Sequence, residues 1–195
     1  MFCAENAVLH GAGREDIDAR CIGTGRPFIL EIDAPKKRTV DLSALEAAIN
    51  ESAKGRVSVA LSHWSDRAEV ETLKSSKAHK KYRILVEVEG QITAETLANA
   101  LKTLSGVTIQ QRTPERVAHR RADKIRERKV LDIECVGEQD GKFILEVLGE
   151  AGLYIKELVS GDQGRTIPSL AEILKRPARV TSLDVVQIEG PQEGD

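Results

Sequence analysis

The stretch VLDIECVGEQDGKFILEVL, residues 130–148, indicates how the sheet of this protein is built. Two apolar-rich segments, residues 130–136 and 142–148, flank the polar turn Gln139-Asp140-Gly141. An Asp-Gly pair between two such segments is typical of a tight turn that joins antiparallel strands. We therefore expect a β-hairpin here, with its two strands side by side in an antiparallel sheet.

Helices and strands follow one another irregularly on both sides of this hairpin. The residue patterns predict further strands at residues 28–33, 56–62, 82–89, 107–111 and 182–188. They predict helices at residues 41–49, capped by Asp41 or Ser43, at 93–104, capped by Thr93, and at 169–174. This order lacks the steady strand–helix alternation of a doubly wound sheet. It predicts an α+β fold with a mainly antiparallel mixed sheet flanked by helices.

Composition limits the class of protein. The 195 residues contain 29 Lys plus Arg against 31 Asp plus Glu, so any contact with nucleic acid must rest on local basic patches. Three widely spaced cysteines and four histidines without ligand spacing predict neither a disulfide framework nor a metal site. No apolar run approaches the roughly 20 residues that span a bilayer, and no signal peptide is recognisable. We expect a soluble cytoplasmic protein with no membrane partner.

The densest charged segment is GREDIDAR at residues 13–20, in which two arginines bracket two carboxylates. Arg14 and Arg20 flank Asp16 and Asp18, and a nearby opposite charge favours the ionised form of a carboxylate. We predict Asp16 as the reactive group and assign Asp18 to structure, paired with Arg14 or Arg20. On the pattern alone, a turn or cap is the commoner role for such an aspartate.

Two further polar segments contain aromatic and basic residues that a site around Asp16 would need. One has Tyr82 at the start of a predicted strand, and the other has Tyr154, Lys156 and Arg165 in a glycine-rich stretch. Together with Asp16 they would supply two rings, cations and a carboxylate, which suits the binding and attack of a planar ligand. The simpler interpretations are that Tyr82 packs in its strand and that Lys156 is a surface lysine.

A basic block covers residues 112–129 and has five more positive than negative charges. Its arginines include Arg112, Arg116, Arg120 and Arg121. Such a block is either a solvated face or a contact for phosphates, and the pattern favours the two equally.

Four stretches resemble those of a pseudouridine synthase. They are residues 10–32 (HGAGREDIDARCIGTGRPFILEI), 77–86 (KAHKKYRILV), 111–130 (QRTPERVAHRRADKIRERKV) and 152–170 (GLYIKELVSGDQGRTIPSL). More specifically, they resemble the archaeal and eukaryotic family that modifies uridines 54 and 55 in the T arm of tRNA. The resemblance runs through most of the chain and implies a pseudouridine-synthase-like fold and an isomerase that needs no cofactor.

The resemblance also implies roles for single residues. Asp16 falls on the catalytic aspartate, and Tyr82 falls on the tyrosine that stacks against the target base. Tyr154 falls on a second substrate-contacting tyrosine, Lys156 on the basic partner of the aspartate, and Leu158 on an apolar residue lining the pocket. Arg165 is a second candidate for pairing with a carboxylate or a phosphate, and Arg14, Arg20 and the basic block are expected to support RNA binding.

Typical members of this family carry an additional amino-terminal RNA-binding region, whereas here the catalytic signature begins by residue 10. We expect residues 1–195 to form one catalytic domain without that region, with two sub-lobes as the alternative. The expected partners are the T-arm stem-loop of tRNA and a separate RNA-binding domain supplied in trans. The competing hypothesis is a structured-RNA-binding module that is catalytically silent or active only with its partner.

Overall fold

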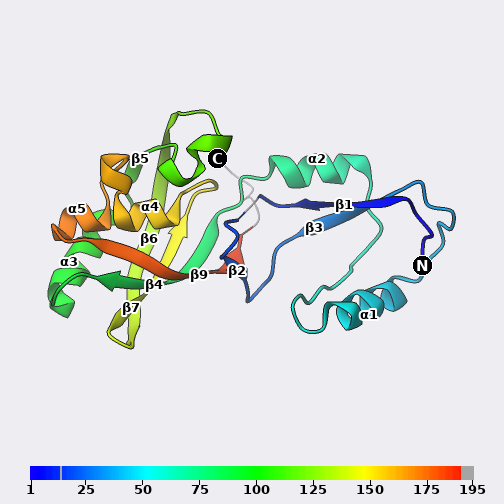
Figure 1. Ribbon diagram of the computed structural model, residues 1–195, viewed down its shortest axis with the longest axis horizontal. Helices are drawn as coiled ribbons and strands as arrows, with labels where there is room; N and C mark the ends of the chain where they lie inside the picture. Colours follow the sequence, from blue (N-terminus) through cyan, green and yellow to red (C-terminus); the bar gives the residue numbers. More distant parts are fainter. Residues whose placement is uncertain (14, 190–195) are drawn as a thin grey trace. The chain divides into compact units, whose positions relative to one another are not determined.

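The computed structural model describes residues 1–13 and 15–189, and the chain divides into two compact units. Unit 1 comprises Met1–Arg14 and Pro27–Ser76, and unit 2 comprises Glu15–Arg26 and Lys77–Asp195 (Figure 1). The chain therefore enters unit 2 briefly through residues 15–26, returns to unit 1, and then completes unit 2.

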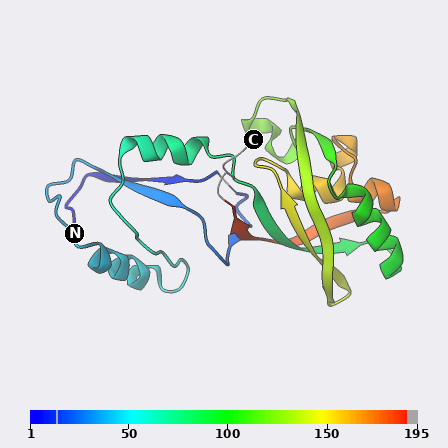
Figure 2. The ribbon, with the colours of Figure 1, turned by 180° about the vertical axis from the view of Figure 1, so that it is seen from behind.

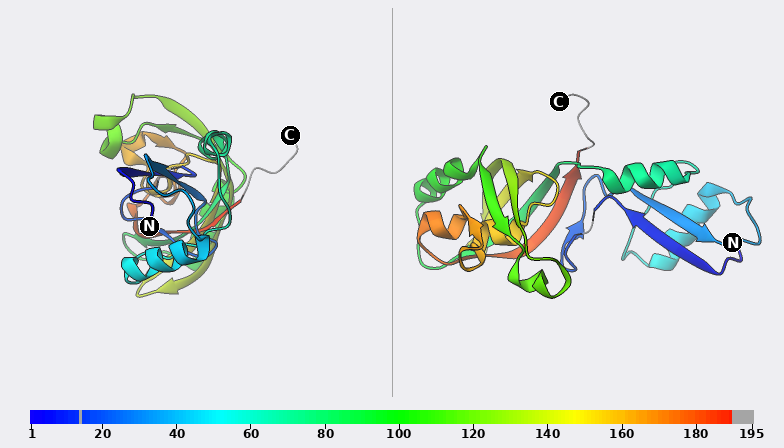
Figure 3. Two further views of the ribbon diagram at one scale, coloured as in Figure 1. Left: turned by 90° about the vertical axis from the view of Figure 1, so that its right-hand side faces the viewer. Right: turned by 90° about the horizontal axis from the view of Figure 1, so that it is seen from above.

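Unit 1 consists of a two-stranded antiparallel sheet and two helices. Strand β1 (Asn6–Gly11) pairs with β3 (Phe28–Asp33), and helix α2 (Arg67–Ser75) contacts β1 (Figure 3). Helix α1 (Leu42–Ala53) is capped by Asp41, whose carboxylate accepts the N–H of Ala44 at 2.8 Å. The predicted strand at 28–33 and the predicted helix with its Asp41 cap are confirmed, whereas the residue patterns miss β1 and α2.

The strand predicted at residues 56–62 is wrong. This described segment forms no strand. Side chains of α1 bind its backbone instead. The Asn50 side chain donates to the Val59 carbonyl at 2.9 Å and accepts the Val59 N–H at 2.8 Å. Glu46 accepts the N–H of Leu61 at 2.7 Å. These bonds satisfy backbone groups that a neighbouring strand would otherwise pair with.

Unit 2 is built on a seven-stranded sheet with the order β2-β9-β4-β7-β6-β5-β8. The strands are β2 (Arg20–Cys21), β4 (Lys80–Val88), β5 (Thr108–Arg112), β6 (Ile125–Gln139), β7 (Lys142–Gly149), β8 (Thr166–Ile167) and β9 (Ala178–Ile188). Only β2 and β9 run parallel, and the other neighbours are antiparallel. The prediction of an α+β fold with a mainly antiparallel mixed sheet is confirmed.

The predicted hairpin is confirmed as β6 and β7, which pair antiparallel (Figure 2). The two residues of its turn, Asp140 and Gly141, have φ values of 52° and 73°. Two successive residues with positive φ are typical of the type I′ turn, whose twist matches that of the strands. The Asp-Gly pair therefore sets both the turn and the antiparallel direction.

Three helices pack together on the sheet of unit 2: α3 (Ala94–Leu104), α4 (Ile155–Ser160) and α5 (Leu170–Leu174). Helix α3 contacts β6, α4 contacts β9, and α5 contacts both helices; Figure 1 shows α4 and α5 in front of the sheet. Thr93 caps α3 as predicted, by accepting the N–H of Thr96 at 3.1 Å. Alternate side chains of β4, from Lys80 through Tyr82 and Ile84 to Val86, are buried. This face of β4 thus continues from the apolar core to a charged end at Lys80.

Ion pairs attach residues 15–20, hereafter the charged loop, to the rest of unit 2. Glu15 pairs with Lys80 of β4, and both side chains are largely buried. Lys156 of α4 donates to both carboxylate oxygens of Asp18 at 2.7 Å. Arg20 forms two hydrogen bonds to Asp184 of β9, of 2.6 and 2.7 Å.

Of the two pairings predicted for Asp18, the one with Arg20 is wrong, because Arg20 binds Asp184. Asp18 instead accepts hydrogen bonds from Lys156. The other predicted partner, Arg14, lies outside the described residues.

Gly23, just beyond the charged loop, should tolerate no side chain. Its φ is 70°, and an added Cβ would lie 2.2 Å from the carbonyl oxygen of Val186. Gly25 is the matched control, because its φ is 75° and an added Cβ would meet no atom within 4 Å. We predict that Gly25→Ala lowers the free energy of unfolding by about 1–2 kcal/mol, and that Gly23→Ala lowers it by clearly more. Equal losses of unfolding free energy for the two variants in urea denaturation would contradict the close approach of Gly23 to the Val186 carbonyl.

Glu15→Gln should destabilise unit 2 strongly, because it leaves the ammonium of Lys80 largely buried without its carboxylate partner. We predict a loss of about 3–5 kcal/mol in the free energy of unfolding at neutral pH. Asp18→Asn is the control from the same loop. The Asp18 side chain is mostly exposed, so its pair with Lys156 should contribute about 0–1 kcal/mol. Urea denaturation of the two variants measures both values, and a loss no larger for Glu15→Gln than for Asp18→Asn would refute the prediction.

The pair of Asp18 should also give a pH-dependent contribution to stability. The hydrogen bond from Lys156 lowers the pKa of Asp18, against an opposing effect of partial burial. Because the pKa is lower in the folded than in the unfolded chain, the contribution is complete above the ordinary aspartate pKa and disappears as the pH falls through the folded value. We predict that the stability difference between wild type and Asp18→Asn is constant near neutral pH and closes below about pH 4. A difference that does not change with pH would contradict this.

Candidate active site

Asp16 lies between two cations that come from different elements of unit 2. Its Oδ1 accepts a hydrogen bond of 2.7 Å from Nη1 of Arg116, in the 3₁₀ helix η1 (Glu115–Arg120). Its Oδ2 lies 3.9 Å from Nζ of Lys156, at the start of α4. Lys156, the predicted partner, is therefore close to Asp16, but Arg116 is closer and forms the hydrogen bond.

Arg116 joins Asp16 to a second carboxylate, Glu157. Its Nε and Nη2 donate to the two oxygens of Glu157 at 2.6 and 3.2 Å, and the Glu157 side chain is only 4% exposed. Burial alone would lower the pKa of Arg116, but the hydrogen bonds to Glu157 and Asp16 outweigh it and raise that pKa. The guanidinium therefore stays charged while it links the two carboxylates. The sequence predicts Arg116 as a support for RNA binding, and the structure places it directly beside Asp16.

Tyr82 lies at the end of the apolar core, near the charged loop. It is 3% exposed and belongs to the buried cluster that includes Ile84 and Val185. Burial raises the pKa of the Tyr82 phenol, and the negative charges of Glu15 and Asp16 raise it further. Tyr82 is therefore a neutral phenol at physiological pH, and only a small part of its surface is open to a ligand.

Tyr154 and Leu158 position α4 through different contacts. The backbone N–H of Tyr154 donates to Oε1 of Gln111 and its carbonyl accepts from Nε2 of the same side chain, both at 2.9 Å. Gln111 is fully buried, and so is Leu158, which belongs to the same core cluster as Tyr82. The start of α4, which carries Lys156, is thus attached to β5 and packed against the core.

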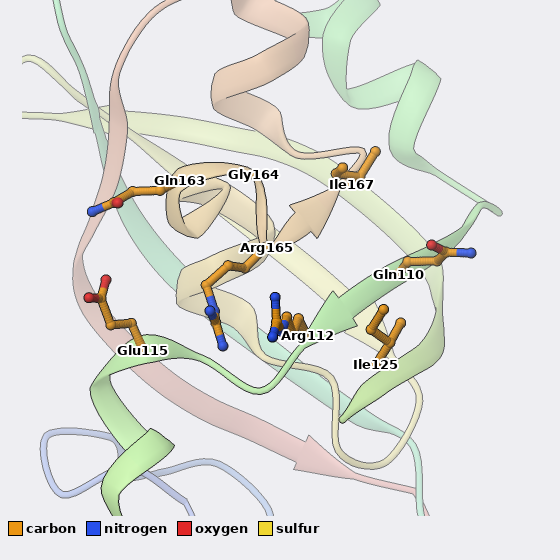
Figure 4. A pocket seen from close by; sticks show the side chains of 8 residues that line it. All are labelled: Gln110, Arg112, Glu115, Ile125, Gln163, Gly164, Arg165 and Ile167. Carbon is orange, nitrogen blue, oxygen red and sulfur yellow. The ribbon is translucent and has the colours of Figure 1, made fainter. Parts of the chain in front are cut away.

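Arg112 and Arg165 both bind Asp123. In the described part of the chain, neither of them forms a recorded hydrogen bond to Asp16. Asp123 accepts from Nε of Arg112 at 2.9 Å and from Nη2 of Arg165 at 3.2 Å. Arg165 also donates to the Thr113 carbonyl at 2.7 Å. Both arginines line a pocket of about 460 Å³, which Ile125 also lines (Figure 4). Arg165 thus has a carboxylate partner, one of the two kinds of partner expected for it.

The remaining predicted arginines lie elsewhere. Arg120 and Arg121 are exposed at the end of η1, where they are open to a large partner. Arg20 is engaged by Asp184. Among residues 1–13 and 15–189, no cluster of three or more His, Cys, Asp or Glu side chains is arranged to hold a metal ion. No helix in the same described ranges is long and apolar enough to cross a bilayer.

Sequence reasoning misses Glu157, Gln111 and the pair of Glu15 with Lys80. One signal was available for Glu157, since it is an acidic residue that directly precedes the apolar residues Leu158 and Val159. A carboxylate in an apolar run is rarely buried unless a cation pairs with it. The identity of that cation, 41 residues away, has no local signal.

The chain is similar to known proteins whose names match the pseudouridine synthase family that the sequence motifs resemble. The chain is 48% identical over 187 residues to a protein of Halorubrum lacusprofundi named tRNA pseudouridine synthase Pus10, covering 96% of this chain and 44% of that protein. It is 49% identical over 188 residues to the protein of the same name from Archaeoglobus fulgidus, covering 96% of this chain and 52% of that protein. The chain thus spans about half the length of the curated relatives it matches.

Among solved structures, a chain of a Cbf5-Nop10-Gar1 complex aligns with 57% of this chain and 31% of its own length, with a TM-score of 0.48 and 25% identity. A family model described as "Pus10, C-terminal" matches residues 1–189. That match covers nearly the whole sequence, including the charged loop, η1 and α4. The chain therefore belongs to the Pus10 C-terminal family.

Proposed function

We propose that this chain contains the catalytic unit of a tRNA pseudouridine synthase, in which Asp16 is the reactive carboxylate and no cofactor takes part. The observation that carries the proposal is the carboxylate of Asp16, held 2.7 Å from the guanidinium of Arg116 and 3.9 Å from the ammonium of Lys156 in unit 2. The names of the relatives, which are 42–49% identical to this chain, support the reaction and the substrate class.

The reaction is an isomerisation of uridine. The bond between C1′ of the ribose and N1 of the uracil breaks, and a bond between C1′ and C5 forms. C5 loses its proton and N1 gains one, so the product has the same atoms and the same oxidation state as the substrate. Asp16 assists the cleavage as a nucleophile or as a base, both of which are roles of a carboxylate.

The other residues of the site bind the substrate. The target uridine must leave the RNA stack to reach a carboxylate in a pocket, which is how enzymes that act on a base reach it. Tyr82 contacts the uracil as a neutral ring, and Tyr154 and Leu158 shape the pocket. Lys156 is a basic partner of Asp16. Arg120, Arg121 and Arg112 contact phosphates, which carry most of the affinity for RNA.

The proposed substrate is the T-arm stem-loop of tRNA, with modification at position 54, at position 55, or at both. The proposal includes unit 2 as the catalytic part, because Asp16, Arg116 and Tyr82 all belong to it. It also includes a separate RNA-binding domain as a partner that strengthens binding of the whole tRNA.

Asp16→Asn tests the proposal, because it keeps the size of the side chain and removes its negative charge. We predict that pseudouridine formation in a T-arm stem-loop falls by at least about 10³-fold, with RNA affinity nearly unchanged. Chemical mapping of pseudouridine measures the first quantity, and fluorescence anisotropy measures the second. Asp140→Asn, in the hairpin turn, is the matched control and should retain wild-type activity.

Three outcomes would reject the proposal in its stated form. A wild-type chain that binds the stem-loop but forms no pseudouridine would support the silent RNA-binding module. Product that appears only after an RNA-binding domain is added would support a partner-dependent subunit. Activity that survives Asp16→Asn would remove Asp16 from the chemistry.

A further inference from the structure

We propose that Glu157 is a positioning residue for this reaction. It holds Arg116 in one orientation, and Arg116 in turn fixes the direction of the Asp16 carboxylate. The inference rests on the proposed function, and it assigns a role to a buried carboxylate that the sequence patterns do not single out.

The geometry of the guanidinium carries the inference. Nε and Nη2 of Arg116 donate to Oε1 and Oε2 of Glu157, at 2.6 and 3.2 Å. Two parallel hydrogen bonds between a guanidinium and a carboxylate fix the plane of the guanidinium as well as its distance. The third donor, Nη1, then points in a determined direction, and Asp16 accepts its hydrogen bond at 2.7 Å. Glu157 therefore determines the orientation of the Asp16 carboxylate through Arg116.

Glu157 is itself held firmly. Its side chain is 4% exposed, and its neighbours Leu158 and Val159 on α4 are fully buried. Among the described residues, both side-chain hydrogen bonds recorded for Glu157 go to Arg116. Turning the carboxylate away would leave a buried charge without its partner, which is strongly unfavourable. Glu157 therefore has one stable arrangement, and it is the one that holds Arg116.

Lys156 cannot orient Asp16 in the same way. Its ammonium donates to both oxygens of Asp18 at 2.7 Å and lies 3.9 Å from Oδ2 of Asp16. An ammonium is a compact charge with rotatable donors, whereas a guanidinium presents its donors in a rigid plane. Arg116 thus holds Oδ1 of Asp16, and Oδ2 is the oxygen that the geometry leaves for the substrate.

The first test measures the orientation of Arg116 without using activity. Nuclear magnetic resonance of the ¹⁵N-labelled guanidinium distinguishes a held group, whose two Nη atoms give separate signals, from a freely rotating one, whose signals merge. We expect separate signals for Arg116 in the wild type and in Asp16→Asn, and merged signals in Glu157→Gln. Separate signals that persist in Glu157→Gln would overturn the proposal.

The second test asks whether Glu157 acts through Arg116. We expect Glu157→Gln to lower kcat for the T-arm stem-loop by about 10- to 100-fold, with KM changed less than about twofold. Arg116→Gln should lower kcat at least as much, and the double variant should lose no more than Arg116→Gln alone, because the two residues act as a unit. If the reductions in kcat of the two single variants multiply in the double variant, Glu157 does not act through Arg116 and the proposal is overturned.

Glu146→Gln is the matched control, because Glu146 is also a largely buried carboxylate that pairs with two cations, Lys81 and Arg83. It should lower the melting temperature and leave kcat unchanged. If Glu157→Gln does not fold by circular dichroism, Arg116→Lys replaces it: lysine keeps the charge but lacks the rigid plane, so the same loss of kcat is expected. Wild-type kcat in Arg116→Lys would overturn the proposal.

The outcomes separate this inference from the proposed function. A wild-type chain without activity on the stem-loop rejects both. An active wild type together with an unchanged kcat in Glu157→Gln rejects the positioning role alone.

Discussion

The attraction between opposite charges holds the charged loop in place, and the candidate site depends on it. Glu15, Asp16, Asp18 and Arg20 each pair with a residue from a different element, namely β4, η1, α4 and β9. The one large apolar side chain of the loop, Ile17, is fully exposed. Burial of apolar surface therefore contributes little to the position of the loop. Hydrogen-bonded ion pairs are directional, whereas the hydrophobic effect is not, so they suit a segment whose carboxylate must point one way.

The partners of the loop are placed by the sheet and by α4. Buried residues alternate along β4 and end with Lys80, so the strand that builds the core also ends in a cation. Gln111 of β5 attaches the start of α4, and the buried face of α4 then fixes Glu157. Packing of the core thus determines the positions of Lys80 and Glu157. The ion pairs that these residues form then determine the position of Asp16. The candidate site and the core are thus built from the same elements, β4 and α4.

Local signals in the sequence predict much of this architecture. The hairpin follows from Asp140-Gly141, the start of α3 from Thr93, and both depend only on neighbouring residues. Alternation over residues 56–62 was misleading, because it reports compatibility with a strand and not the presence of a partner. At the site, the resemblance points to Asp16, Tyr82 and Lys156, whereas the bond between Arg116 and Asp16 joins residues 100 positions apart. Contacts at such separation leave no local pattern in a single sequence.

Among the charged side chains of the loop, exposure increases from Glu15 to Arg20. The exposed fractions of the side chains are 12% for Glu15, 22% for Asp16, 63% for Asp18 and 67% for Arg20. Dissolved ions screen exposed charges strongly and buried charges much less, with a Debye length of about 8 Å at physiological ionic strength. Salt would therefore weaken the ion pairs of Asp18 and Arg20 more than those of Glu15 and Asp16. Asp16, the proposed reactive carboxylate, therefore lies on the side of the loop that ionic strength affects least.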